Sequence, residues 1–175
     1  MKALRWFVYD AKLRMSSFWH LVFPLFGRSP KPEYDTHGWA PLHRAVMKSD
    51  LGSVKRLLST GSDPNVRSRR GELTSLHLAA QLGDEQLCLA LLEAGANPNI
   101  PEYVDGLTPL YHAIEAGSAE TVGLLLCFGA DARIRTRWGN NILEWEKAMT
   151  DNEIIQDFLY DVLGWRAYLM AIDGD

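Results

Sequence analysis

The chain contains little cysteine, with Cys88 and Cys127 the only two such residues in 175. They do not form a Cys-x-x-Cys pair, and no spaced set of histidines and cysteines accompanies them. The sequence therefore indicates neither a structural zinc site nor a disulfide framework. We expect no bound metal and no cofactor. A chain with so few thiols suits a reducing compartment, and we expect a cytoplasmic location.

Long hydrophobic runs are also lacking. The longest uncharged stretch near the start, residues 15–27, has 13 residues and contains a proline, whereas a membrane-spanning helix needs about 20 apolar residues. No small-residue cleavage site follows this stretch, so we do not expect a secretory signal. The membrane role that the sequence leaves open is peripheral contact with a bilayer.

An excess of positive charge is absent as well. The 18 Lys and Arg stand against 22 Asp and Glu, which gives a formal net charge of −4. That is the wrong sign for a protein whose main task is to neutralise nucleic-acid phosphates. Enzyme motifs are missing too, because there is no glycine-rich phosphate loop, no His-Glu-x-x-His and no Gly-x-Ser-x-Gly. With 47% hydrophobic residues, the chain has the composition of one folded unit. We expect it to be neither an enzyme nor a nucleic-acid-binding protein.

What the sequence does contain is an internal repeat. The segments APLHRAV, TSLHLAA and TPLYHAI begin at Ala40, Thr74 and Thr108, a spacing of 34 residues. The segments TGSDPN, AGANPN and FGADAR follow in the same register, with a glycine again every 34 residues. Two motifs that keep one spacing over three copies indicate a repeat architecture, in which each unit packs on its neighbours.

Each unit predicts two helices joined by a turn. Thr74 and Thr108 are placed to cap the first helix through the side-chain oxygen. Pro109 suits the first turn, because its fixed φ fits and its missing N–H is not needed there. The second helix carries apolar residues at helical spacing, and the glycine after it tolerates the positive φ of a helix end. Cys88 and Cys127 fall within these second helices, where free cysteine acts as a small apolar side chain.

The repeated pattern resembles that of the ankyrin repeat family, G-x-T-P-L-H-x-A-A followed by V, L-L and G-A-D-x-N, over about residues 36–163. The resemblance implies an all-α solenoid of helix-turn-helix repeats with β-hairpin fingers. It also implies that His43 and His77 hold neighbouring repeats together by hydrogen bonds. Asn65 and Asn99 are expected to close the hairpins as turn residues. The fourth repeat is degenerate, as the end of a stacked array requires. The expected repeats are residues 36–70, 71–104, 105–138 and 139–163.

Two flanking segments lie outside the repeats. Residues 1–30 place apolar side chains on one helical stripe beside lysines and arginines, which predicts an amphipathic helix, and residues 164–175 predict a short closing helix. The first helix has two interpretations that stay open. It either caps the exposed face of the first repeat, or lies in a membrane interface or against a partner. The aromatic residues that would make the second kind of contact are Trp6, Phe7, Phe18, Trp19 and Phe23.

The repeat register places arginines on two of the expected fingers. The fourth finger carries RIRTRW, the second carries the related segment NVRSRR, and the third has the acidic and aromatic segment NIPEYVDG. Alternation along an extended segment would put Arg133, Arg135 and Arg137 on one face. The family resemblance implies that fingers and first helices line a concave binding surface. The residues expected to contact a partner are Trp39, Met47, Lys48, Arg67, Arg69, Arg70, Gln81, Tyr103, Glu115, Arg135, Arg137 and Trp138.

These observations favour a stand-alone interaction protein that binds another protein, with an acidic surface as a suitable target. Blocking the partner is the simpler mechanism, as in an immunity-like or antitoxin-like inhibitor, and an adaptor is the related hypothesis. The alternative class is a membrane-associated targeting module that uses the N-terminal aromatic and basic helix. Nucleic-acid binding through the arginines is the third hypothesis, and steep salt dependence would be its signature. The identity of the partner and the oligomeric state stay open.

Overall fold

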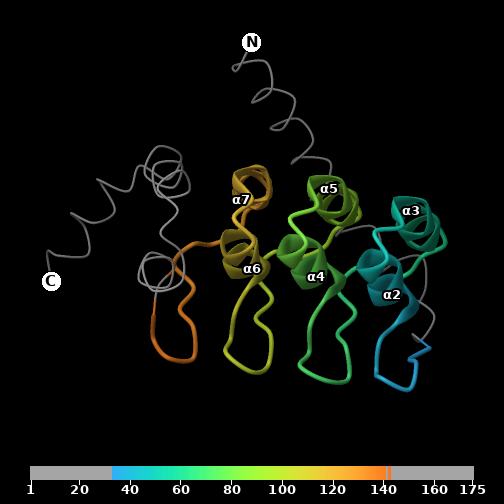
Figure 1. Cartoon of the computed structure of the whole chain (residues 1–175), viewed down its shortest axis with the longest axis horizontal. Coiled ribbons are helices and arrows are strands. Elements are labelled where there is room, and N and C mark those ends of the chain that lie inside the picture. The colour runs from blue at the N-terminus through green and yellow to red at the C-terminus, as the bar shows by residue number, and fades with distance from the viewer. Residues whose placement is uncertain (1–32, 141, 143–175) are drawn as a thin grey trace, which may run out of the picture.

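The computed structural model describes residues 33–140 and 142, and it shows helix pairs stacked side by side (Figure 1). The first helix of each pair belongs to an inner row, the second to an outer row, and four loops extend from the inner row on one side. The inner helices are α2 (Pro41–Met47), α4 (Ser75–Gln81) and α6 (Pro109–Glu115). The outer helices are α3 (Leu51–Ser59), α5 (Glu85–Glu93) and α7 (Ala119–Cys127). The all-α solenoid predicted from the repeat is confirmed.

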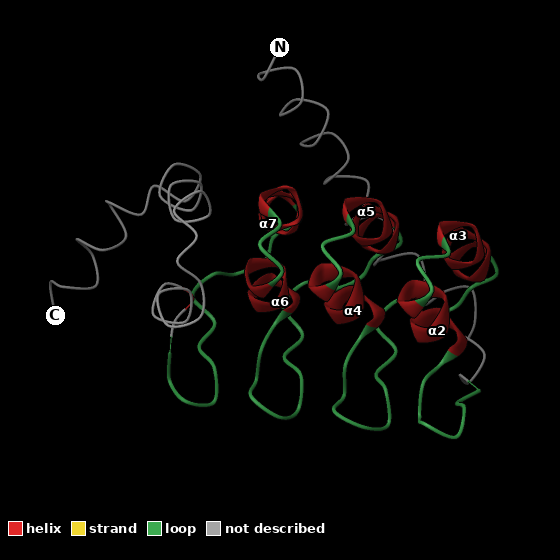
Figure 2. Cartoon of the chain, viewed as in Figure 1, coloured by secondary structure: helices red, strands yellow, loops and turns green. Residues whose placement is uncertain are grey.

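The four loops are the fingers, and they comprise residues 33–40, 60–74, 94–108 and 128–140. Within the described part of the chain they contain turns and no strand (Figure 2). The expected β-hairpin fingers are thus hairpin-shaped loops without a strand ladder, because side-chain oxygens take up the N–H groups that a ladder would use.

The two flanking helices predicted over residues 1–30 and 164–175 lie outside the described residues. So do Trp6, Phe7, Phe18, Trp19 and Phe23, and most of the fourth repeat. These remain predictions. Among the residues that are described, no helix has the length and apolarity needed to cross a bilayer.

The outer helices begin and end at residues suited to those positions. The side chains of Asp50, Asp84 and Ser118 each accept a backbone N–H from the first turn of the helix that follows, which satisfies donors that the helix itself leaves unpaired. Gly95 and Gly129 follow the helix ends with φ of +91° and +85°. The prediction that glycine ends these helices in the left-handed region is confirmed.

The inner helices begin differently from the prediction. The side chain of Thr74 makes no cap hydrogen bond to the helix backbone. Its hydroxyl instead lies 2.8 Å from Nδ1 of His77, which also accepts the Thr74 backbone N–H at 3.1 Å. Thr108 likewise makes no side-chain cap bond. The predicted threonine cap was wrong, because at Thr74 the imidazole takes the hydroxyl that would have bonded to the backbone.

Histidines join neighbouring repeats. Nε2 of His43 lies 2.9 Å from the carbonyl oxygen of Leu73, and Nε2 of His77 lies 3.2 Å from that of Leu107. A carbonyl only accepts, so Nε2 carries the proton and Nδ1 is the acceptor. The expected structural role of both histidines is confirmed. In the third repeat Tyr111 takes this place, and its hydroxyl donates to the carbonyl of Ile134 at 2.6 Å.

Asn65 and Asn99 connect repeats, which corrects their interpretation as turn residues of a single hairpin. The Asn65 amide donates to the carbonyl of Gly95 at 3.1 Å, and its oxygen accepts the N–H of Asn97 at 2.7 Å. Asn99 does the same one repeat later, with Gly129 and Asp131. The partners lie 30 and 32 residues away in sequence, so a local turn rule does not find them.

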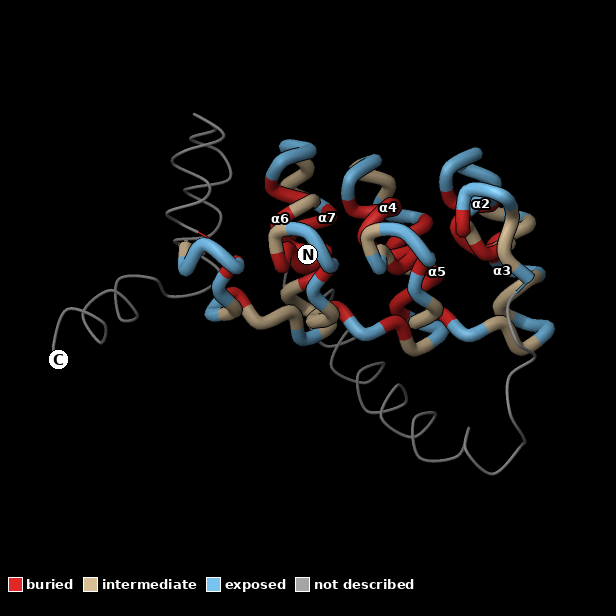
Figure 3. Tube along the Cα trace, turned by 90° about the horizontal axis from the view of Figure 1, so that it is seen from below, coloured by how far each residue is buried: buried red, intermediate tan, exposed pale blue. Residues whose placement is uncertain are grey.

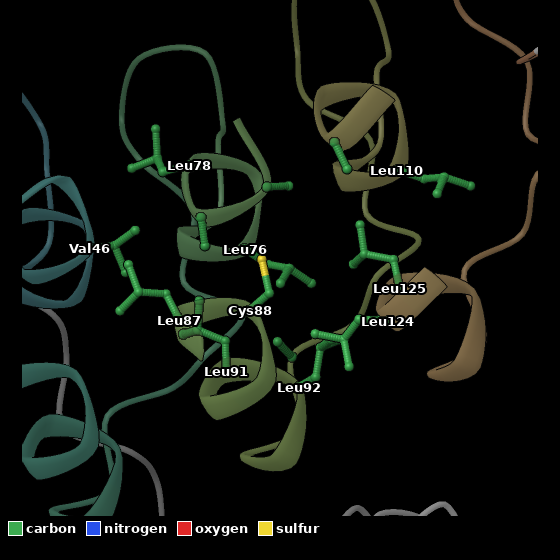
Figure 4. Close-up of a cluster of buried hydrophobic side chains, with 14 of the residues drawn as sticks. Val46, Leu76, Leu78, Leu87, Cys88, Leu91, Leu92, Leu110, Leu124 and Leu125 are labelled. Carbon is green, nitrogen blue, oxygen red and sulfur yellow. The ribbon is translucent and has the colours of Figure 1, made fainter. Parts of the chain in front are cut away.

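The core fills the space within and between the helix pairs. Figure 3 shows the buried residues concentrated where the helices face one another, and Figure 4 shows leucines of α4 and α5 meeting those of α6 and α7. Cys88 is fully buried in this core, and burial raises the pKa of its thiol to about 12. Burial also raises the pKa of the Cys127 thiol. Neither cysteine is an activated nucleophile, in agreement with the apolar role predicted for both.

Replacing Ser75 by proline is expected to stabilise the fold. Ser75 is buried at the first position of α4, where α2 and α6 have proline, and its hydroxyl has no hydrogen-bond partner among the described residues. The residue before it, Thr74, has the extended conformation that proline requires. We expect Ser75→Pro to raise the free energy of unfolding by about 1 kcal/mol, measured by urea denaturation. Ser75→Ala is the control for removal of the hydroxyl alone, and equal or lower stability of the proline variant would contradict the prediction.

Candidate functional site

Each finger is closed by one main-chain hydrogen bond and by a side-chain oxygen at its first turn. The side chains that supply this oxygen are Asp35, Ser68, Glu102 and Thr136, and each accepts backbone N–H groups from the loop that follows. The side chain of Asp35 accepts from His37 and Trp39, and the hydrogen bond from Trp39 is the main reason that the pKa of Asp35 is lowered. A local polar network thus gives every finger a defined tip.

Neighbouring fingers are tied together at equivalent positions. The N–H of Arg69 donates to the carbonyl of Gly38 at 3.0 Å, the N–H of Tyr103 to that of Gly71 at 2.8 Å, and the N–H of Arg137 to that of Asp105 at 2.8 Å. The three donors are spaced by 34 residues. Each finger tip therefore has a fixed position relative to the finger before it.

Two arginines of these tips stack on tyrosines of the preceding finger. The guanidinium carbon of Arg69 lies 4.6 Å from the ring centroid of Tyr34, and that of Arg137 lies 4.8 Å from the ring centroid of Tyr103. These are cation–π distances. Gly106 permits the second contact, because a Cβ there would lie only 3.1 Å from Cγ of Arg137 and its φ is +75°. The arginines are held in place by aromatic faces rather than by opposite charges.

Other arginines of the fingers are engaged differently. Arg67 forms an ion pair with Glu72, and Arg133 forms one with Asp131 at 2.9 Å. The hydrogen bond from the Arg133 side chain is the main reason that the pKa of Asp131 is lowered. Arg135 donates from Nη1 to the carbonyl of Gly139 at 2.6 Å. The alternating arginines of the fourth finger are all exposed, but they have different partners and do not form a single basic surface.

The tips of the third and fourth fingers expose large apolar side chains. The exposed fractions are 58% for Tyr103, 60% for Val104 and 72% for Trp138. Nε1 of Trp138 donates to the carboxylate of Asp105 at 3.1 Å, so this indole is fixed although it is exposed. We call the exposed group at these tips the finger-tip surface, and its residues are Arg69, Arg70, Tyr103, Val104, Arg137 and Trp138.

The sequence identified most of the finger-tip surface and missed Val104. It also missed two supporting residues, Tyr34 and Asp105. The repeat register contained a signal for the tyrosine, since Tyr34 precedes Arg69 by 35 residues much as Tyr103 precedes Arg137 by 34. Trp39, which was expected to contact a partner, is half-buried against the core, with its ring centroid 5.4 Å from that of His43.

The free ends of the inner helices form a second exposed group. Met47 and Leu82 are exposed by 53% and 51%, and Lys48, Gln81 and Glu115 are exposed beside them at the equivalent ends. Leu82 was not among the predicted contact residues, although it is equivalent to Lys48 in the 34-residue register. Inner-helix ends and finger tips thus lie at the two ends of one row of helices (Figure 1).

The buried histidines beneath this surface are neutral. Burial, followed by the nearby His112, lowers the pKa of His77 to about 3, and burial lowers the pKa of His43 and His112. The rings of His77 and His112 meet edge to face with centroids 5.6 Å apart. Within residues 33–140, no group of three histidine, cysteine or acidic side chains is arranged to hold a metal ion. The histidines therefore support packing between repeats.

Stacked helix pairs with finger loops on one side define a helical repeat protein that offers an extended surface for recognition. The sequence profile of ankyrin repeats matches residues 42–137 and 76–162, with three copies. The chain belongs to the ankyrin repeat family. Repeats of this family are generally protein–protein interaction modules and are typically not enzymes.

Several known proteins share short stretches with this chain. It is 52% identical over 44 residues to ankyrin repeat domain-containing protein 46 of Danio rerio, which covers 25% of this chain and 19% of the relative. It is 53% identical over 38 residues to phytochrome-interacting ankyrin-repeat protein 2 of Arabidopsis thaliana, which covers 22% of each. It is 47% identical over 49 residues to transient receptor potential cation channel subfamily A member 1 of Homo sapiens, 28% of this chain and 4% of the channel. The chain thus spans about a fifth or less of each relative.

Proposed function

We propose that this protein binds a specific partner protein through its finger tips and the free ends of its inner helices, and so acts as an inhibitor or an adaptor. The observation that carries the proposal is the location of the large apolar side chains that are exposed among residues 33–140. They are Met47, Leu82, Tyr103, Val104 and Trp138, and all five belong to fingers or inner-helix ends. Exposed aromatic and apolar side chains on one side of a molecule are typical of a protein interface.

The outer helices support this choice of side. Their large apolar residues are buried or half-buried, and their exposed positions carry charged or polar groups such as Lys55, Glu85 and Glu120. A partner that docked on the outer row would meet a mostly polar surface. Fixed geometry adds to the argument, because Trp138 and Arg137 are ordered by contacts to the third finger before any partner binds. Side chains that are already ordered lose less conformational entropy on binding.

The test begins with the full chain as bait in a lysate of the source cell. The captured protein is purified, and hydrogen exchange of the chain is compared with and without it. We expect protection at residues 100–108, 134–140 and the ends of α2 and α4. Protection confined to α3, α5 and α7 would contradict the proposal.

The same complex distinguishes the two modes of action. Under saturation with the chain, loss of the partner's own activity would identify an inhibitor. Unchanged activity together with co-capture of a third protein would identify an adaptor. Unchanged activity without a third protein would reject both modes and leave binding alone.

A further inference from the structure

We propose that the finger-tip surface recognises an extended acidic segment of a protein, in which two carboxylate groups about six residues apart flank an apolar side chain. This inference rests on the proposed function and names the chemistry of the partner. It is carried by the two stacked arginines, the distance between them and the apolar group that lies at the third and fourth finger tips.

The stacked arginines have hydrogen-bonding capacity that the folded chain does not use. Within the described residues, the guanidinium groups of Arg69 and Arg137 make neither a hydrogen bond nor an ion pair, although Tyr34 and Tyr103 hold them in place. A guanidinium has five N–H donors in a planar fork that matches a carboxylate. Stacking on a ring face leaves the edge of the fork available. Two such groups, fixed before binding, are suited to bidentate carboxylate contacts.

The spacing between the two arginines sets the length of the segment. Arg69 and Arg137 stand at equivalent positions two repeats apart. Packed helices are about 8–10 Å apart, so the two guanidinium groups are separated by roughly 20 Å. An extended chain advances about 3.3 Å per residue. Carboxylates that reach both arginines therefore lie about six residues apart in an extended segment.

The residues between the arginines define the middle of the segment. The third finger lies there, and it presents Tyr103 and Val104 instead of a cation. Trp138 adds an exposed indole on the next tip, fixed by Asp105. A leucine or phenylalanine in the middle of the segment would bury its side chain against this apolar group. Such a central apolar anchor between charged contacts is the usual arrangement of binding energy in protein interfaces.

Nucleic acid fits the same surface less well. Single-stranded nucleic acid is held by aromatic faces on which bases stack and by cations that follow each phosphate. Arg69 and Arg137 already cover one face of Tyr34 and Tyr103. The third finger has no cation between Asn99 and Leu107, so the basic track is interrupted. The chain as a whole is also acidic, with a net charge of −4.

The probe for this inference is a synthetic peptide with a Glu-Glu pair near each end, six residues apart, and a Leu-Phe pair between them. Its affinity for the full chain is measured by fluorescence anisotropy in low salt. We expect Arg69→Gln/Arg137→Gln to weaken binding about 30- to 100-fold, because two bidentate charge-assisted contacts are lost. The matched control is Arg67→Gln/Arg133→Gln, which removes the same charge from the same fingers but from internal ion pairs. We expect a change of less than about threefold for the control.

Further probes decide whether the chemistry is as proposed. They are the same peptide with glutamine for glutamate, a single-stranded oligouridine, and vesicles of phosphatidylcholine and phosphatidylserine. Equal binding of the glutamine peptide, equal effects of the two double variants, or no binding of the acidic peptide would overturn the inference. Tighter binding of RNA or vesicles that depends on the stacked arginines would overturn it as well. Capture of a partner whose footprint lies on the inner-helix ends would then leave the proposed function standing without this inference.

Discussion

Acidification from pH 7 to pH 4 is expected to unfold the repeat array. His43, His77 and His112 are neutral and largely enclosed in the folded chain, and burial is the main cause that lowers the pKa of each, to about 3 for His77. In the unfolded chain a histidine titrates near pH 6.5. Below that pH the unfolded state binds more protons than the folded state. Stability is therefore complete above about pH 6.5 and falls as the pH decreases toward the folded pKa.

The magnitude follows from the number of histidines. Each contributes a slope of about 1.4 kcal/mol per pH unit where the unfolded form is protonated and the folded form is not. His77 alone is then expected to cost about 4 kcal/mol by pH 3.5, a large part of the stability of a small domain. Neighbouring charges modify this result. Arg67 and His112 oppose the charging of His77, whereas Glu115 and Glu102 favour the charging of His112 and Asp35 favours that of His43.

Urea unfolding at pH 7, 6, 5 and 4 measures this dependence. We expect the free energy of unfolding to fall throughout the series, and His77→Gln to reduce the slope by about one proton per molecule. The control is His37→Gln, which removes an exposed histidine on the first finger and leaves the buried ones in place. A free energy of unfolding that stays constant between pH 6.5 and 4.5 would show that the buried histidines do not govern acid stability.

The helices of the array were predictable because their signals are local and repeated. Pro41 and Pro109 mark the first positions of inner helices, and Gly95 and Gly129 follow the ends of outer ones. The 34-residue spacing then shows that the same unit recurs, and stacking is the way such a unit buries its apolar face. The position of the fingers followed from the same register.

The partners of polar side chains were less predictable, because they lie one repeat away or depend on loop length. Asn65 was interpreted within its own turn, yet it bonds to Gly95 and Asn97. The first finger closes from Asp35 to Trp39 and the second from Ser68 to Leu73, so the first is one residue shorter. That difference shifts Tyr34 out of the 34-residue register and hides its contact with Arg69. Contacts of this kind depend on the folded position of two loops and leave no spacing rule in the sequence.

Glu102 shows the same limit for charge. In the sequence it belongs to the acidic segment of the third finger and suggests a negative tip. In the fold its residue is only 7% exposed, and its carboxylate accepts the N–H groups of Val104, Asp105 and Leu107. Its charge is thus used to shape the finger rather than to attract a basic partner.

Replacing Glu102 by alanine is therefore expected to destabilise the chain by about 2–4 kcal/mol and to displace Tyr103 and Val104. The variant leaves three backbone N–H groups of the tip without their acceptor, and each unsatisfied buried donor costs about 1–3 kcal/mol unless water reaches it. Water will reach some of them in a loop, so the total stays below the sum. The main-chain bond from Glu102 to Leu107 persists in the variant, because it does not involve the side chain.

Urea unfolding and hydrogen exchange of residues 103–107 measure the two effects of Glu102→Ala. The matched control is Glu72→Ala on the second finger, where an exposed carboxylate pairs only with Arg67, and we expect it to cost less than about 1 kcal/mol. Glu102→Gln keeps one oxygen acceptor and is expected to lie between the two. A Glu102→Ala variant as stable as Glu72→Ala, with unchanged exchange, would mean that the main-chain bonds alone shape the tip. If instead exchange rises while peptide binding falls more than in Glu72→Ala, the third finger is needed as an ordered part of the binding surface, because no charge facing the peptide has been removed.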